Sequence, residues 1–184
     1  MIVSIDGNIG SGKSTILDIL SQRGFKVVKE GTDIWSDVLQ NFYQEQSRWS
    51  FTLQTAILID MHEKYKALSH SNDIIFFERN PVSSLLFTEN SYENKYLNNT
   101  EYSHYMRLYK LLSWKPDRII KLNTPPDVCY SRIMSRNDPG TQSGLTLQYV
   151  EKLNDKYNFM EGEYIDGTCS VDEIADTILD LVGH

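Results

Sequence analysis

The feature that most constrains the fold is a glycine-rich segment near the start of the chain, GNIGSGKST at residues 7–15. A short apolar run precedes it at residues 2–6, and a helical pattern follows over residues 13–23. Strand, glycine-rich turn and helix in this order are typical of a P-loop, whose backbone N–H groups surround nucleotide phosphates. The sequence therefore predicts an α/β fold with a phosphate site at the end of its first strand.

The residue types within this segment fit that chemistry. Lys13 is expected to reach the transferred phosphoryl group, and Ser14 is expected to bind Mg²⁺ beside ATP. The alternative is a glycine-rich turn that merely begins a helix, and the presence of both Lys13 and Ser14 counts against it. The residues expected to hold the ATP phosphates are Gly7, Asn8, Ile9, Gly10, Ser11, Gly12, Lys13, Ser14 and Thr15.

Strands and helices are expected to alternate along the rest of the chain. Further strands are predicted at residues 25–28, 73–77, 118–122 and near Tyr164, and loops at 91–100 and 137–144. Further helices are predicted at residues 49–68, 101–114, 126–136, 146–159 and 171–182. This order predicts a parallel five-stranded sheet flanked by helices, in one domain over residues 1–184.

Composition restricts the classes of function. The net charge of −7 and pI near 5.1 argue against binding of long nucleic acid. No apolar run approaches the length of a membrane span, and the apolar strand directly after Met1 leaves no room for a leader. Cys129 and Cys169 are expected to be buried thiols, because they are too few and too far apart for a metal knuckle. We expect a soluble, cytoplasmic protein.

Acidic and basic residues follow the second and third predicted strands, where the ligand edge of a parallel sheet lies. Glu30 could take a proton from a hydroxyl group there, although a solvated surface glutamate is the simpler interpretation. Glu78 could lie near Mg²⁺, with Arg79 stabilising the moving phosphoryl group. A plain ion pair at the strand end remains equally open for these two residues.

Several segments together resemble the deoxynucleoside kinase family, in that family's order and at nearly its spacing over residues 1–160. They are GNIGSGKST, residues 30–35, Tyr43, Arg48-Trp49, Gln54, Glu78-Arg79, LNTPPDVCYSRIMSR at 122–136 and LQYVEKL at 147–153. The resemblance implies a P-loop kinase fold with a lid loop at about 132–145. It also implies transfer of the ATP γ-phosphate to the 5′-hydroxyl of a deoxynucleoside, in nucleotide salvage.

The resemblance assigns roles to individual residues. Glu30 matches the general base, Arg79 an arginine that contacts this region and the phosphates, and Glu78 the acid near the metal. Gln54 matches a glutamine that pairs with the base, and Tyr43 a tyrosine that holds the sugar 3′-hydroxyl. Trp35 and Phe87 would form apolar walls, for which ordinary core packing is the alternative.

Base preference and the lid are the variable parts of this resemblance. Met61 and Ser84 are a neutral pair where cytidine-selective relatives carry charges, so thymidine is expected, with deoxycytidine also accepted. Arg132 and Arg136 would clamp the transferred charge from the lid. Asp138 would replace a sugar-binding glutamate, in a lid that departs from the usual family pattern.

Two other hypotheses for the function remain open. A nucleoside monophosphate kinase, such as a thymidylate kinase, needs extra arginines for its acceptor phosphate, and the sequence shows few. A nucleotide-binding module without transfer activity, whether a switch or a scaffold, would need no acceptor pocket. The resemblance further implies a homodimer.

Overall fold

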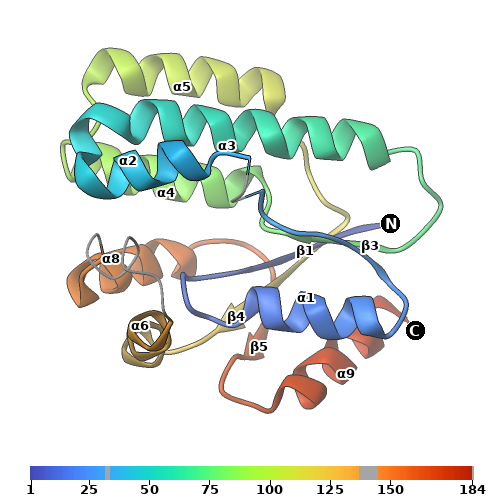
Figure 1. The fold of residues 1–184 in the computed structure, drawn as a ribbon. Helices are drawn as coiled ribbons and strands as arrows, with labels where there is room; N and C mark the ends of the chain where they lie inside the picture. The colour runs from blue at the N-terminus through green and yellow to red at the C-terminus, as the bar shows by residue number, and fades with distance from the viewer. Residues whose placement is uncertain (32–33, 137–144, 184) are drawn as a thin grey trace.

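The computed structural model describes residues 1–31, 34–136 and 145–183, and within them five parallel strands form one sheet. Their order across the sheet is β2-β3-β1-β4-β5 (Figure 1). The strands are β1 (Ile2–Gly7), β2 (Lys26–Val28), β3 (Ile75–Glu78), β4 (Arg118–Asn123) and β5 (Glu163–Asp166). The predicted parallel five-stranded sheet is thus confirmed.

Helices cover both faces of this sheet. In Figure 1, α1 and α9 lie on one side, and α2, α3, α4 and α5 lie on the other. The helices are α1 (Lys13–Gln22), α2 (Ser36–Gln44), α3 (Gln46–Leu68), α4 (Pro81–Glu93), α5 (Asn99–Leu112), α6 (Pro126–Ser135), α8 (Leu147–Asn158) and α9 (Val171–Val182). Helix α8 packs against α4 and α6.

The largest apolar cluster joins the sheet to α1 and α9. All six residues of β1 are buried, and its side chains Val3 and Ile5 meet Leu17 of α1 and Ile178 of α9 in one core. A strand buried on both faces is expected at the centre of a parallel sheet. This core fixes the end of β1, and with it the glycine-rich turn that follows.

The start of α4 is fixed by local chemistry. Asn80 forms a capping box with Ser83, and Pro81 occupies the first turn, where its missing N–H is not needed. The Asn80 side chain also donates to Asp6 of β1 over 2.7 Å. Burial raises the pKa of Asp6, whose carboxyl group also accepts from Ser4 and Ser83. These bonds tie the turn after β3 to β1.

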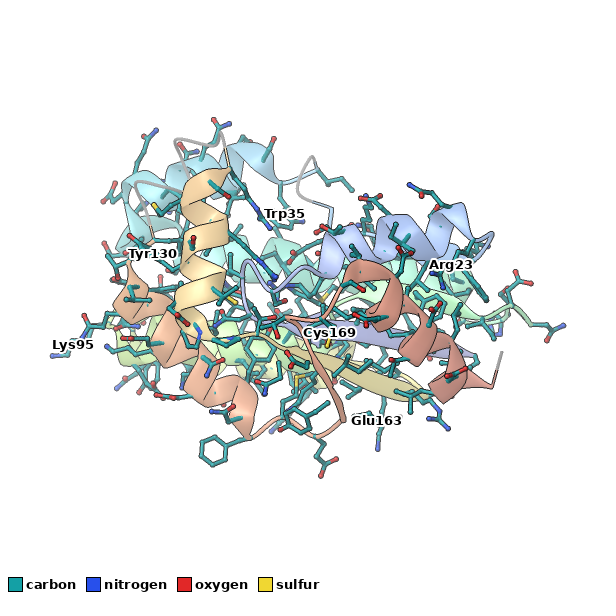
Figure 2. The ribbon with its side chains drawn as sticks, turned by 90° about the horizontal axis from the view of Figure 1, so that it is seen from below. Arg23, Trp35, Lys95, Tyr130, Glu163 and Cys169 are labelled. Carbon is teal, nitrogen blue, oxygen red and sulfur yellow. The ribbon has the colours of Figure 1, made fainter. Side chains whose placement is uncertain are left out.

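The structure corrects three expectations. Residues 91–93 continue α4 and residues 99–100 begin α5, so only 94–98 of the predicted loop connect helices. Two helices, α2 and α4, were not predicted at all. Cys129 is buried as expected, but Cys169 is exposed in the turn between β5 and α9 (Figure 2), because that turn lies outside the core.

None of the helices in the described ranges has the length and apolar character needed to cross a membrane. The homodimer, the cytoplasmic location and the single domain over residues 1–184 stay predictions.

Candidate active site

A cavity of about 460 Å³ opens at the carboxyl ends of the strands, and it gathers most of the predicted site residues. Those that line it are Ile9, Gly10, Gly12, Lys13, Ser14, Glu30, Trp35, Tyr43, Gln54, Met61, Glu78, Arg79, Ser84, Phe87 and Arg136. Gly7, Asn8, Ser11, Thr15 and Arg132 are not part of its lining. Asp138 lies outside the described residues.

The glycine-rich turn is shaped by close contact with its neighbours. Gly10 has a φ of 79°, and a Cβ atom there would lie 2.4 Å from the backbone oxygen of Cys129. Only glycine fits this contact without moving the backbone. Thr124 donates to the Ser11 carbonyl over 3.1 Å, so the start of α6 and the loop before it support the turn.

Lys13, the first residue of α1, is buried beside this turn, and no carboxylate of the described residues forms an ion pair with it. Its Nζ donates to the backbone oxygens of Gly7 and Asn8, at 3.1 and 2.8 Å. Burial, together with the charge of Arg79, lowers the pKa of Lys13 to about 8, and Glu78 and Glu30 only partly offset this. An anionic ligand in the turn would therefore favour the charged form of Lys13.

This pKa predicts a pH dependence of nucleotide binding. Because the phosphates bind the protonated amine, affinity for ATP should be flat below about pH 8 and fall above it, approaching tenfold per pH unit. Titration calorimetry between pH 6.5 and 10 measures this. The Lys13→Arg variant should bind without the break, since a guanidinium stays charged. A wild-type affinity for ATP that does not fall between pH 8 and 10 would contradict the lowered pKa.

The same lowered pKa has a consequence for the ligand-free protein. The unfolded chain holds the Lys13 proton up to the ordinary lysine pKa of 10.5, whereas in the folded chain the pKa is about 8. The unfolded state thus binds more protons between these values, so Lys13 makes stability rise with pH in that window. A phosphate bound in the turn would favour the protonated Lys13 amine and so oppose this effect.

Ser14 and Glu78 form a small oxygen site beside the turn. The Ser14 hydroxyl donates to Glu78 Oε1 over 2.8 Å, and Glu78 Oε2 accepts from the backbone N–H of Glu30 at 3.3 Å. A hydroxyl and a carboxylate oxygen are ligands that Mg²⁺ prefers, with water and phosphate completing its shell. The side chains therefore fit a magnesium ion.

Arg79 is the central cation of the cavity, and its backbone is strained. It follows β3 with a φ of 70°, which is uncommon for a residue other than glycine. Its guanidinium donates to the Gly7 oxygen over 3.0 Å and to the Tyr157 hydroxyl, and it lies 4.8 Å from the centre of the Phe87 ring. Three elements thus hold this side chain in place.

The electrostatics keep Arg79 charged. Burial acts to lower its pKa, but interactions with Tyr157, Glu30, Asp6 and Glu78 raise it above the ordinary value. Burial also raises the pKa of Tyr157, so that phenol stays protonated. Tyr157 belongs to α8, far along the sequence, and no spacing signal in the chain pointed to it.

Glu30 faces the cavity at 3.3 Å from Arg79 Nε, with its side chain about one fifth exposed. The loop that carries it rests on helix α3. Lys64 donates to the Lys29 oxygen over 3.1 Å and to Asp60 over 2.7 Å, and Gly31 packs against this ion pair. A Cβ at Gly31 would lie 2.6 Å from Asp60 Oδ2 and Lys64 Nζ, so a larger residue would push the ends of these two side chains aside.

Two buried polar atoms at the cavity have no hydrogen-bond partner among the described residues. They are the acceptor Oε1 of Gln54 and the donor Nε1 of Trp35, each in a residue that is nearly inaccessible. Buried polar groups are rarely left unpaired in native proteins. Their position at the cavity wall indicates a ligand that offers complementary hydrogen-bonding groups.

The two predicted lid arginines behave differently. Arg132 donates to the oxygens of Ser11 and Gly167, at 3.2 and 3.3 Å, and so braces the glycine-rich turn from α6. Arg136, immediately after α6, lines the cavity. Tyr149 of α8, within the LQYVEKL segment, also lines the cavity, and so do Phe42 and Leu39 of α2, which no motif or resemblance had indicated.

Comparison with known proteins shows which family has a chain of this kind. A family model described as deoxynucleoside kinase matches residues 3–180. The chain belongs to the deoxynucleoside kinase family. Its members are enzymes that phosphorylate deoxynucleosides, so this chain is a deoxynucleoside kinase that uses a nucleotide phosphate donor.

Individual relatives agree with this assignment. A putative kinase of Invertebrate iridescent virus 3 is 33% identical over 184 residues, covering all of this kinase and 92% of the relative. Human deoxycytidine kinase is 32% identical over 192 residues, covering 84% of this kinase and 73% of the human enzyme.

A solved structure confirms the fold. The deoxyadenosine kinase of M. mycoides, in a structure with dCMP and a flexible dCDP bound, aligns with a TM-score of 0.86. The alignment covers 99% of this kinase and 98% of that chain at 22% identity. The P-loop kinase fold expected from the sequence is therefore confirmed.

Proposed function

We propose that this kinase transfers the γ-phosphate of ATP to the 5′-hydroxyl of a pyrimidine deoxynucleoside, thymidine first and deoxycytidine also. The observation that carries the proposal is the single cavity that joins the glycine-rich turn to the unpartnered oxygen of Gln54. Phosphates and a base could thus occupy its two parts together. A site of this kind favours transfer by positioning both reactants.

The acceptor chemistry is assigned to Glu30 and Arg79. Glu30 takes the proton of the 5′-hydroxyl as the oxygen attacks, and Arg79 stabilises the charge of the transferred group. Lys13 contacts the moving phosphoryl group from the other side. Mg²⁺, held by Ser14 and Glu78, would neutralise phosphate charge when bound.

The remaining lining residues are assigned to the nucleoside. Gln54 pairs with the base through one donor and one acceptor, while Trp35 and Phe87 form apolar walls. Tyr43 holds the sugar, and Met61 and Ser84 present a neutral end to the pocket. Arg136 and Arg132 contribute positive charge from the lid side. Asp138, outside the described residues, is assigned to the sugar from the family resemblance alone.

The content of the cavity bears on the alternative of a nucleoside monophosphate kinase. Among the described lining residues, Arg79 and Arg136 are the only arginines, and Arg79 is already bonded to Gly7, Tyr157 and Glu30. A second phosphate would need further cations. This supports a neutral nucleoside as the acceptor.

A phosphorylation assay with ATP and Mg²⁺ tests the proposal. The four deoxynucleosides and thymidylate are compared by kcat/KM, and we expect thymidine and deoxycytidine to exceed the purine deoxynucleosides and thymidylate. A preference for deoxyadenosine or deoxyguanosine would contradict the base assignment while leaving the family activity intact. A preference for thymidylate would contradict the acceptor assignment.

A further inference from the structure

The base end of the cavity carries a hydroxyl group with a second, deeper hydroxyl group behind it. Ser84 lines the cavity together with Gln54 and Met61, and only 2% of its surface is exposed. Its Oγ lies 2.7 Å from the hydroxyl of Tyr105 on α5, and either atom can be the donor. Tyr105 is fully buried. The polarity that Ser84 offers to a ligand therefore depends on Tyr105.

A third hydroxyl extends the chain. Burial raises the pKa of the Tyr105 phenol to about 12, outweighing hydrogen bonds with Ser84 and Thr88 that lower it. Thr88 lies one turn beyond Ser84 on α4, and its own proton goes to the Ser84 backbone oxygen over 2.9 Å. Thr88 thus interacts with the phenol, and because its own proton is committed to the Ser84 oxygen, its Oγ1 can serve Tyr105 only as an acceptor.

All three groups are neutral hydroxyls near neutral pH, and each can both donate and accept. If Tyr105 donates to Ser84, the Ser84 proton is free to point into the cavity. If Ser84 donates to Tyr105, the phenol proton turns to Thr88, and the Ser84 lone pairs face the cavity. Rotation of O–H bonds interconverts these two states, and no covalent bond breaks.

We propose that Ser84, Tyr105 and Thr88 form a reversible hydrogen-bond chain that lets the base pocket accept pyrimidines with either a 4-oxo or a 4-amino group. The inference rests on the proposed function, which seats a pyrimidine against Gln54. A 4-oxo group, as in thymidine, accepts from Ser84 in the first state. A 4-amino group, as in deoxycytidine, donates to Ser84 in the second.

This chain predicts weak discrimination by the wild-type enzyme. Sites with a fixed donor or acceptor reject a mismatched substrate by about 10⁴-fold, because a buried polar group is left unpaired. Here the kcat/KM values for thymidine and deoxycytidine should lie within about 100-fold of each other, since no group is left unpaired with either.

The Tyr105→Phe variant separates the two states. With deoxycytidine bound, the Ser84 proton has lost its acceptor, whereas with thymidine bound the same proton still points to the base oxygen. We expect the thymidine-to-deoxycytidine ratio of kcat/KM to rise about tenfold, the effect of one unpaired buried hydroxyl. Both kcat/KM values are measured on the same enzyme sample, so a reduced fraction of folded enzyme lowers both equally and leaves their ratio unchanged.

Two further variants sharpen this test. Thr88→Val removes the acceptor for the Tyr105 proton and should shift the ratio in the same direction, which provides a second measurement if Tyr105→Phe folds poorly. Tyr109→Phe is the control, because its ring stacks on Tyr105 from the same helix but its hydroxyl is not bonded to Ser84. It should keep the wild-type ratio.

The outcomes distinguish this inference from the proposed function. If the wild-type enzyme phosphorylates neither pyrimidine but does phosphorylate a purine deoxynucleoside, the proposed function fails and the inference with it. If it phosphorylates pyrimidines but Tyr105→Phe and Thr88→Val keep the wild-type ratio, only the hydroxyl chain is wrong. Discrimination by about 10⁴-fold in the wild type would also refute it.

Discussion

The Glu30→Gln variant should lose nearly all turnover while it still binds ATP. The amide keeps the size of the side chain and can still accept from Arg79, but it cannot take the proton of an attacking hydroxyl. Loss of a general base costs about 10²- to 10⁴-fold in kcat. Steady-state kinetics with the best deoxynucleoside gives kcat, and calorimetry with ATP gives the affinity.

Glu93→Gln is a matched control for this change. Glu93 is exposed on α4, forms an ion pair with Lys156 and does not line the cavity. The kcat of the Glu93→Gln variant should therefore be near the wild-type value. If Glu30→Gln retains more than about a tenth of the wild-type kcat, Glu30 is not the general base.

The Arg79→Lys variant should be the most damaging conservative change in the cavity. A lysine keeps one charge but cannot reproduce the planar fork that reaches the Gly7 oxygen, Tyr157 and Glu30 together. We expect kcat to fall by about 10³-fold, as for loss of an arginine that stabilises a transferred phosphoryl group. The same kinetic assay measures it.

Arg118→Lys supplies the control, because Arg118 forms an exposed ion pair with Glu163 at the other end of β4. It should change kcat and thermal stability little. Thermal unfolding of Arg79→Lys should show a folded protein with a lowered midpoint, since Tyr157 and Glu30 lose a buried partner. A fully active Arg79→Lys enzyme would contradict the role assigned to Arg79.

The sequence was sufficient for the features that depend on local patterns. The apolar runs gave the strands, and the pattern from Gly7 to Ser14 gave the glycine-rich turn that the structure places at the end of β1. Gln54 and Glu30 were found through their spacing in a known family. Their side chains line one cavity, although they lie on separate elements.

Other parts of the site could not be predicted because they depend on packing between distant segments. The contact of Tyr157 with Arg79 requires α8 to pack on α4, and the pairing of Ser84 with Tyr105 requires α5 to lie behind α4. Neither pair has a periodic or motif signal. Helix α2 was not predicted because it is only nine residues long and most of them are polar. Phe42 is its one buried residue, too little for a clear helical pattern of apolar positions.

The exposed side chain of Cys169 shows the same limit. Free cysteines are most often buried, so the composition favoured a buried thiol, but its position in the turn before α9 decides the outcome. Connecting segments run mostly over the surface, because a buried one would leave polar backbone groups unpaired, and Cys169 lies on the exposed side of its turn.

The identity of the product formed from ATP and a pyrimidine deoxynucleoside tests the central claim most directly. Mass spectrometry and phosphorus NMR of the reaction mixture should show the 5′-monophosphate and ADP in equal amounts, with no further phosphorylation of thymidylate. Release of inorganic phosphate without a nucleotide product, or phosphorylation of thymidylate in preference to thymidine, would contradict it.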